Sequence, residues 1–359
     1  MKKPNEKNGE QKSRKSINPL KVTAIVLTTL AFFLVMAALG IGVLLWYSEG
    51  LRGSMFSSDD PISQVQQDGP VDADWIDEYG NAYNYRDDVI SILLMGVDTM
   101  SEETDLWKEN TISNGGNADM LGLVIMDTTT FDFSVLYIPR DTITDVIAMD
   151  ADGNYIDTVQ SQICTSHSYG DGEELSCQLT ADAVSNLLMG APVDRYAALD
   201  EAALQTLNEI VGGVRITFES DCTDIHHTFF AGNTVTLNNW YFNRMVVYRN
   251  HENPDGAYLR GMRIMNVMKA LFHQLKETIT KDPTVALEIV NKLSAYLTTD
   301  LELTEITYLA RNIGQMDFSA DTIVKLRGDT VMGETYAEFH PDPDWIHDFV
   351  VEKFCVPAQ

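Results

Sequence analysis

The stretch ADMLGLVIMDTTTFDFSVLYIPRDTITD, residues 118–145, decides the fold. Its two apolar runs, LGLVIMD and FDFSVLYI, predict two buried β-strands joined by a turn of three threonines. Asp119 stands at the entry of the first strand, and Pro139-Arg140-Asp141 ends the second. Because proline cannot continue a strand ladder, it fixes the direction in which the next two side chains leave the sheet. The stretch therefore predicts a rigid sheet edge that carries an anion and metal site.

Strand and helix patterns alternate on both sides of this stretch. Val89–Val97 (VISILLMGV) is a continuous apolar run and predicts a central strand that ends at Asp98. Residues 145–179 are rich in Asp, Gly and Ser and are expected to be irregular. Further on, the patterns predict helices over 180–189 (with Thr180 as N-cap), 201–211, 238–247, 260–280, 284–296, 304–313 and 344–354, and strands over 195–200, 214–218, 234–237 and 323–326. This order predicts an α/β fold, a mixed central β-sheet with helices on both faces.

One apolar stripe runs along the predicted 260–280 helix. Its members repeat at three-to-four spacing, which is typical of a helix face that packs into the core: Met262, Met265, Met268, Leu271 and Leu275. A lipid-contacting surface is the alternative for so methionine-rich a face.

The N-terminal part predicts a membrane anchor. Residues 1–21 are basic, and residues 22–47 contain no charged side chain and close with Trp46-Tyr47. That run is long enough to span a bilayer and too long for a cleaved signal peptide, so we expect one transmembrane helix with the basic segment in the cytoplasm. Residues 48–88 then read as an acidic linker or stalk, and residues 89–359 as one extracellular domain.

The net charge of −28 argues against binding to nucleic acid, whose phosphates would repel the chain. In so acidic a protein, a cluster of arginines is unexpected and therefore informative.

The four cysteines, Cys164, Cys177, Cys222 and Cys355, all follow the predicted anchor. An even number in an oxidising compartment indicates disulfides, and the short spacing favours a Cys164–Cys177 bond. The pairing of Cys222 and Cys355 stays open. The spacings do not resemble a zinc site.

Acidic and basic residues at strand and helix ends indicate a phosphate site. Asp98 and Asp119 suit a hard cation such as Mg²⁺, although aspartates at strand ends also cap turns. Arg140 and Arg249 supply positive charge, and two further arginines, Arg260 and Arg263, lie on one face near the start of the 260–280 helix, where backbone N–H groups favour anions. Salt bridges to the surrounding acids are the alternative for these arginines.

Six segments fall in the order seen in the LytR-CpsA-Psr (LCP) family, and the chain resembles that family over nearly all of residues 89–355. They are ILLMGVD (92–98), ADMLGLVIMD (118–127), VLYIPRDTITDV (135–146), LLMGAPVDRYAALD (187–200), NEIVGGVRI (208–216) and the pair Arg260-x-x-Arg263. GDTVMGETYAEF (328–339) and QICTSHSYGDG (162–172) resemble clostridial members in particular.

The resemblance implies a phosphotransferase of the Gram-positive cell membrane. Such an enzyme moves a glycopolymer from a polyprenyl-pyrophosphate carrier to peptidoglycan and releases polyprenyl phosphate. By resemblance, Asp98 and Asp119 would bind Mg²⁺ (or Mn²⁺). Four arginines would bind the pyrophosphate: Arg140, Arg249, Arg260 and Arg263. Arg140, the adjacent Asp141 and Asp119 would be the catalytic residues.

Several positions depart from the family pattern. Met100 and Asn117 stand where the family usually has arginines, Gln162 where it has a lysine and Ile264 where it has a glutamine; the family's R-x-R pair is reduced to Arg249. Each lost donor removes transition-state stabilisation. The alternative function is therefore a weak or inactive relative that binds polyprenyl-pyrophosphate lipid or cell-wall polymer in envelope assembly or regulation. Hydrolysis of the pyrophosphate by water is a third reading, because an acceptor leaves no recognisable motif.

Overall fold

The computed structural model describes residues 73–97, 116–150, 153–250, 256–319, 321–333 and 336–358. The predicted cytoplasmic segment, the predicted anchor over 22–47, Asp98 and Met100 lie outside these ranges. Within the described ranges, no helix is both long and apolar enough to cross a membrane.

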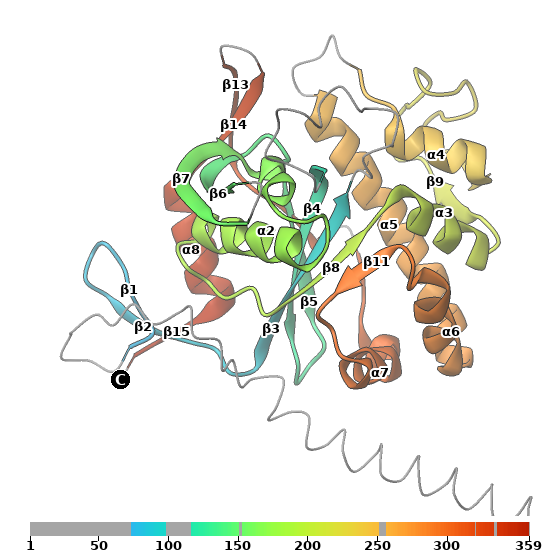
Figure 1. The fold of residues 1–359 in the computed structure, drawn as a ribbon. Coiled ribbons are helices and arrows are strands. Elements are labelled where there is room, and N and C mark those ends of the chain that lie inside the picture. The colour runs from blue at the N-terminus through green and yellow to red at the C-terminus, as the bar shows by residue number, and fades with distance from the viewer. Residues whose placement is uncertain are drawn as a thin grey trace, which may run out of the picture. The chain divides into compact units, whose positions relative to one another are not determined.

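A six-stranded mixed sheet forms the centre of the fold (Figure 1). Its strands, in spatial order, are β11 (Leu297–Thr299), β8 (Arg195–Leu199), β3 (Val89–Val97), β4 (Ala118–Asp127), β5 (Phe133–Ile138) and β12 (Ile323–Lys325). The β3/β8 and β5/β12 pairs are parallel and the other pairs antiparallel. The sheet confirms the predicted fold class, and β4 and β5, both formed by the 118–145 stretch, lie side by side within it.

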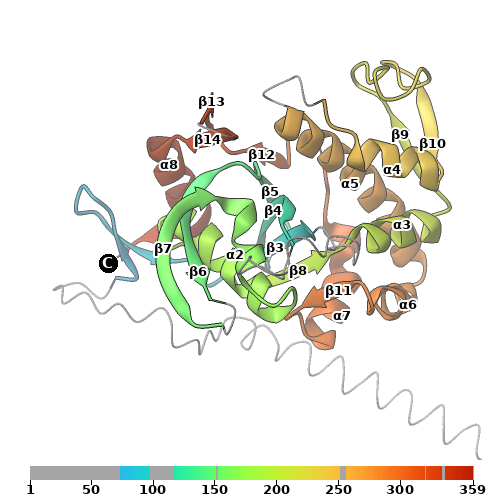
Figure 2. The same cartoon turned by 45° about the horizontal axis from the view of Figure 1, so that its top comes forward.

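Helices cover both faces of this sheet (Figure 2). On one face, Leu93, Leu123 and Leu136 pack in a cluster with α2 (Glu174–Leu187) and α8 (Pro343–Phe354). On the other, apolar residues of β3, β4 and β5 pack against α5 (Gly256–Lys281) and α7 (Leu303–Asn312). The alternation of side chains along each strand explains why two separate cores form.

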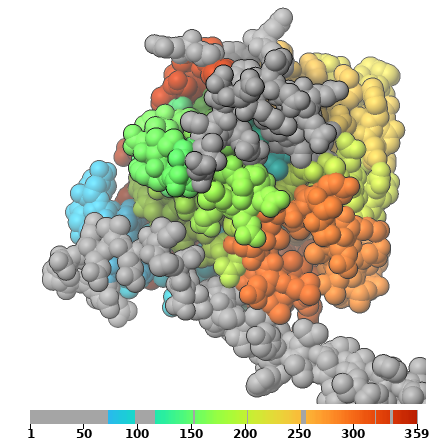
Figure 3. All heavy atoms as spheres, in the orientation of Figure 1, coloured from blue at the N-terminus to red at the C-terminus, as the bar shows by residue number. Residues whose placement is uncertain are grey.

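A second cluster lies beside the sheet and is built on α5. It contains α3 (Glu201–Ile210), β9 (Val214–Thr217), β10 (Thr234–Leu237), α4 (Asn239–Val247) and α6 (Thr284–Leu293). In the space-filling view, its yellow and orange atoms occupy one side of the surface and the green atoms of β7 and α2 the other (Figure 3). The apolar stripe of α5 connects the sheet with this second cluster: Met265 packs toward the sheet, and Leu271 packs into the second cluster. The prediction of a core-facing stripe is confirmed.

The segment predicted as irregular, residues 145–179, is largely regular. It contains most of the hairpin of β6 (Ile143–Met149) and β7 (Tyr155–Gln162), two short 3₁₀ turns, η1 (Ile163–Thr165) and η2 (His167–Tyr169), and the start of α2. The sequence of β7 did not indicate a strand, because most of its side chains are exposed and many of them are polar. Thr180 is not an N-cap: it lies buried inside α2 and donates its hydroxyl to the carbonyl of Ser176 at 2.8 Å.

Part of the segment predicted as a linker is folded. β1 (Trp75–Ile76) and β2 (Ala82–Tyr85) form a three-stranded sheet with β15 (Cys355–Pro357), near the C-terminus. Pairing with a strand more than 250 residues away leaves no local pattern, so the polar composition alone suggested a linker. The remaining elements are the hairpin of β13 (Gly328–Met332) and β14 (Ala337–Pro341) and the turn η3 (Ile313–Gln315).

Candidate functional site

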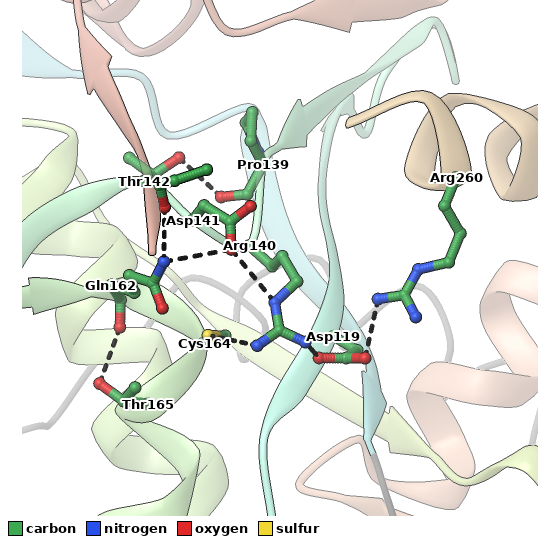
Figure 4. A network of polar contacts seen from close by, with 10 residues as sticks. Asp119, Pro139, Arg140, Asp141, Thr142, Gln162, Cys164, Thr165 and Arg260 are labelled. Carbon is green, nitrogen blue, oxygen red and sulfur yellow. Dashed lines mark hydrogen bonds and ion pairs between the residues drawn. The ribbon is translucent and has the colours of Figure 1, made fainter. Parts of the chain in front are cut away.

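Asp119 is the centre of the polar site (Figure 4). Its Oδ1 accepts a hydrogen bond from Nη1 of Arg140, and its Oδ2 accepts one from Nη2 of Arg260 at 2.8 Å. The three side chains are only 14–17% exposed, so their charges interact more strongly than those of exposed pairs. The structure thus brings together three of the residues that the sequence singled out, from β4, from the end of β5 and from α5.

Arg140 is held by more than Asp119. Pro139 follows the last residue of β5, and its carbonyl accepts the Thr142 hydroxyl at 2.6 Å, which fixes the turn that carries the arginine. Nε of Arg140 lies 3.4 Å from Oδ1 of Asp141, and Nη2 donates to Sγ of Cys164 at 3.3 Å. A guanidinium with three neighbours is oriented before any ligand arrives, which is what recognition of a phosphate requires.

Two glycines allow α5 to approach the sheet closely enough to deliver Arg260. A Cβ at Gly122 of β4 would lie 2.8 Å from Cε of Met265, and one at Gly261 would overlap the Tyr137 hydroxyl. A side chain at Gly261 would meet the rigid Tyr137 ring and hold helix and sheet apart, whereas one at Gly122 would displace the flexible end of Met265.

We expect Gly261→Ala to destabilise the protein by about 1–3 kcal/mol, the usual cost of an overpacked core, and to lower activity because Arg260 moves away from Asp119. Thermal unfolding and turnover check both effects. Gly314→Ala is the control, since a Cβ there meets its nearest neighbour, Thr280, at 3.7 Å. A Gly261→Ala protein as stable and active as the control would contradict the role of this contact.

Arg249 is the third arginine near the site. Burial lowers the pKa of its guanidinium; Asp141 opposes the shift, and Arg140 and Arg260 add to it. Its Nε is buried and has no hydrogen-bond partner among the described residues. Arg249 therefore lies in the electrostatic field of the other two arginines, and among the described residues its Nε–H donor is not used.

The site carries three arginines, Arg140, Arg249 and Arg260, against two carboxylates, Asp119 and Asp141. In a chain with a net charge of −28, this local excess of positive charge is unusual. Partly buried, preoriented guanidinium groups favour a bound dianion such as a phosphate or pyrophosphate.

Arg263 does not contact Asp119. Its Nε donates to the carbonyl of Met245 at 2.7 Å and its Nη2 to the carbonyl of Tyr248. The prediction that it binds pyrophosphate directly finds no support in these contacts, which occupy its guanidinium with backbone oxygens.

The predicted Cys164–Cys177 disulfide is absent: all four cysteines are free in the structure. Cys164 and Cys177 are both buried, but the sulfur of Cys164 faces Arg140 and that of Cys177 lies 3.9 Å from Nε2 of His167. Burial raises the pKa of the Cys164 thiol, although Arg140 opposes that shift. Sequence spacing shows only that two cysteines are near along the chain, not which way their side chains point.

Two of the departures from the family pattern have structural roles. The amide of Asn117 accepts a hydrogen bond from Ser168 at 2.8 Å, and Nε2 of Gln162 donates to the carbonyl of Ala337 at 2.7 Å. Gln162 also reaches Oδ1 of Asp141 at 3.3 Å. Neutral amides at both positions complete the local hydrogen bonding without adding positive charge.

The described residues supply only part of a magnesium site. Asp119 has the carboxylate oxygens that Mg²⁺ prefers, but both accept from guanidinium groups, so a metal would compete with Arg140 and Arg260 for them. Within the described ranges, no group of three His, Cys, Asp or Glu residues is placed to hold a metal ion. The second predicted ligand, Asp98, lies outside those ranges.

An exposed apolar side chain lies on the central strand that leads to the site. Leu94 of β3 is 43% exposed, whereas Ile90 and Ile92 on the same face are 1% and 6% exposed. Leu94 pairs with Gly122 of β4, which has no side chain to cover it. Leu94 is therefore exposed on the α5 side of the sheet. Sequence pattern alone missed this feature, because an apolar run in a central strand predicts burial throughout.

The fold and site define a class of α/β protein with an arginine-rich polar site at one edge of its sheet, and comparison with known proteins identifies the class. The profile of the LytR_cpsA_psr family matches residues 57–344. The chain belongs to this family.

Two curated relatives carry the name polyisoprenyl-teichoic acid–peptidoglycan teichoic acid transferase TagU. The protein from Halalkalibacterium halodurans is 24% identical over 245 residues, which is 65% of this chain and 70% of the relative. That from Bacillus licheniformis is 27% identical over 217 residues, 59% of this chain and 61% of the relative. Against other TagU proteins the chain spans about half of their length.

Solved structures share the fold. Protein gbs0355 from Streptococcus agalactiae superposes with a TM-score of 0.57 at 18% identity, over 74% of this chain and 87% of that one. TagT bound to LIIa-WTA superposes with a TM-score of 0.54 at 18% identity, over 82% of this chain and 95% of that one. At this identity the likeness establishes the fold alone. A clostridial subtype stays a prediction.

Proposed function

We propose that this protein is a membrane-anchored phosphotransferase that moves a glycopolymer from a polyprenyl-pyrophosphate carrier to peptidoglycan and releases polyprenyl phosphate outside a Gram-positive cell. The observation that carries the proposal is the pairing of Arg140 and Arg260 with Asp119, with Arg249 in the field of both arginines. Leu94 adds an exposed apolar side chain on the same sheet. A pyrophosphate lipid would match both features, with a dianionic head for the arginines and an apolar tail for the exposed leucine. Family membership and the names of the TagU relatives support the same reaction class.

The arginines bind the pyrophosphate and stabilise the charge that develops in the transition state. Arg140 is oriented in advance, Arg260 approaches from α5, and Nε of Arg249 has no hydrogen-bond partner in the described part of the chain. When the pyrophosphate oxygens replace Asp119 as partners of the guanidinium groups, the carboxylate is released. Donors that need no rearrangement at the moment of reaction contribute most to such catalysis.

Mg²⁺ (or Mn²⁺) is proposed as the cofactor, with Asp119 and Asp98 as its ligands. Such an ion neutralises charge on phosphate oxygens. If it acts here, chelation abolishes turnover and added Mg²⁺ restores it. Turnover that is unaffected by chelation would show that the arginines alone suffice.

The polyprenyl tail is proposed to lie on the α5 side of the sheet at Leu94. We expect Leu94→Gln to weaken binding of a long-chain polyprenyl-pyrophosphate substrate about tenfold, because it removes apolar contact area while the polar site stays intact. KM is compared for long-chain and short-chain lipids, and the short-chain value should change little. Leu303→Gln, at a leucine of α7 that is 60% exposed, is the control. Equal effects on both lipids would exclude a tail at Leu94.

The direct test of the reaction uses the full-length protein in detergent with a polyprenyl-pyrophosphate-linked saccharide and a peptidoglycan acceptor. The proposal predicts polyprenyl phosphate and a saccharide joined to the acceptor through a phosphodiester. Release of polyprenyl phosphate with free saccharide phosphate would instead indicate a pyrophosphatase.

The alternative function is a relative that binds the lipid or a cell-wall polymer without turnover. Asn117 and Gln162 favour it, because their neutral amides stand where the family pattern has positive charge. It predicts saturable binding of the pyrophosphate lipid with no product in the same assay. Metal-dependent turnover would exclude it.

A further inference from the structure

We infer that Arg263 is a positioning residue: its guanidinium caps the C-terminal end of α4 and fixes the backbone from which Arg249 reaches the anion site. The inference rests on the proposed function, since it concerns how Arg249 comes to bind the pyrophosphate. It assigns different tasks to the two arginines of the Arg260-x-x-Arg263 pair.

The contacts of Arg263 are those of a helix cap. Its Nε donates to the carbonyl of Met245, in the last turn of α4, at 2.7 Å, and its Nη2 donates to the carbonyl of Tyr248 just after the helix. The last carbonyls of a helix have no intrahelical partner and form its negative end, which favours a cation. The guanidinium carbon also lies 5.8 Å from the Tyr248 ring centroid, where the ring's face attracts the charge.

The guanidinium of Arg263 is partly buried in this position. Burial lowers its pKa; Cys222, Asp224 and Tyr248 oppose that shift, and Arg260 adds to it. No ion pair between Arg263 and a carboxylate is found among the described residues. Moving it to a phosphate would leave two backbone carbonyls without their donors, a cost that Arg260 does not carry.

The cap acts on Arg249 through one peptide bond. The Tyr248 carbonyl that Arg263 binds belongs to the peptide group joining Tyr248 to Arg249. From the other side, Gly256 at the start of α5 packs against the backbone just after Arg249: a Cβ there would overlap the carbonyl oxygen of Asn250. Because Nε of Arg249 has no partner among the described residues, backbone placement has a large share in deciding where its head lies.

A double-mutant cycle in the full-length protein tests the inference. Arg263→Ala should lower kcat/KM for a polyprenyl-pyrophosphate saccharide about tenfold, mainly by raising KM, and Arg249→Ala should have the same effect. The double variant should lose little beyond Arg249→Ala alone, because Arg263 acts through that residue. Arg263→Lys should recover only part of the loss, since an ammonium cannot present two parallel donors to two carbonyls. Arg311→Ala, at an exposed position in α7, is the matched control.

Losses that multiply in the double variant, or full activity of Arg263→Lys, would overturn the inference in favour of direct contact between Arg263 and the phosphates. Backbone amide exchange is the second measurement and needs no turnover. Amides at 246–250 should exchange faster in Arg263→Lys than in Arg311→Lys; unchanged exchange would overturn the inference. A wild-type protein that neither turns over nor binds the lipid contradicts the proposed function alone, and the exchange result then decides the positioning role.

Discussion

Replacing Arg140 by alanine is expected to lower kcat by a factor of about 10²–10³. Arg140 is the guanidinium that is held on three sides, by Asp119, Asp141 and Cys164, and preoriented donors of this kind contribute most in the transition state. Release of polyprenyl phosphate by the full-length protein is the measurement. KM should rise less than kcat falls.

The Arg140→Ala protein should remain folded, because Asp119 keeps Arg260 as its partner. Arg140→Lys should be intermediate, since it keeps the charge but loses the planar pair of donors. Arg311→Ala serves as control for the loss of a surface arginine. Turnover retained in Arg140→Ala would show that the site lies elsewhere in the protein.

Replacing Asp119 by asparagine is expected to separate binding from catalysis. The carboxylate holds two arginines in the absence of substrate, so its removal leaves Arg140 and Arg260 free for an anion. Inorganic pyrophosphate should therefore bind about threefold to tenfold more tightly without metal, because a competing negative charge is gone. Turnover should nevertheless fall by about 10² or more, because the arginines lose their orientation and a proposed Mg²⁺ ligand is missing.

Calorimetric titration with pyrophosphate, with and without Mg²⁺, measures the first effect, and lipid turnover measures the second. Asp132→Asn, at an exposed aspartate in the turn between β4 and β5, is the control. Weaker metal-free binding by Asp119→Asn would contradict the competition between its carboxylate and the anion. Undiminished turnover would remove Asp119 from the site.

The sequence alone predicted the central part of the fold. β3 has the predicted bounds, β4 ends at the predicted Asp127 but begins at Ala118, ahead of the predicted run, and β5 ends at Ile138, just before Pro139. These strands are largely buried on both faces, and a short continuous apolar run between turn residues is typical of such a strand. The prediction failed where a strand is exposed or pairs over a long distance, as in β7 and β2, because neither situation leaves a periodic local pattern.

For the site, the residue types and their places at strand and helix ends were enough to nominate Asp119, Arg140 and Arg260. Only the tertiary structure decided that both arginines share one carboxylate, that Arg263 binds the backbone of α4, and that Cys164 contacts Arg140. Sequence records which side chains are available and the periodicity that buries them. Their directions depend on how closely α5 approaches the sheet at Gly122 and Gly261, and that distance is set by packing between segments more than 100 residues apart.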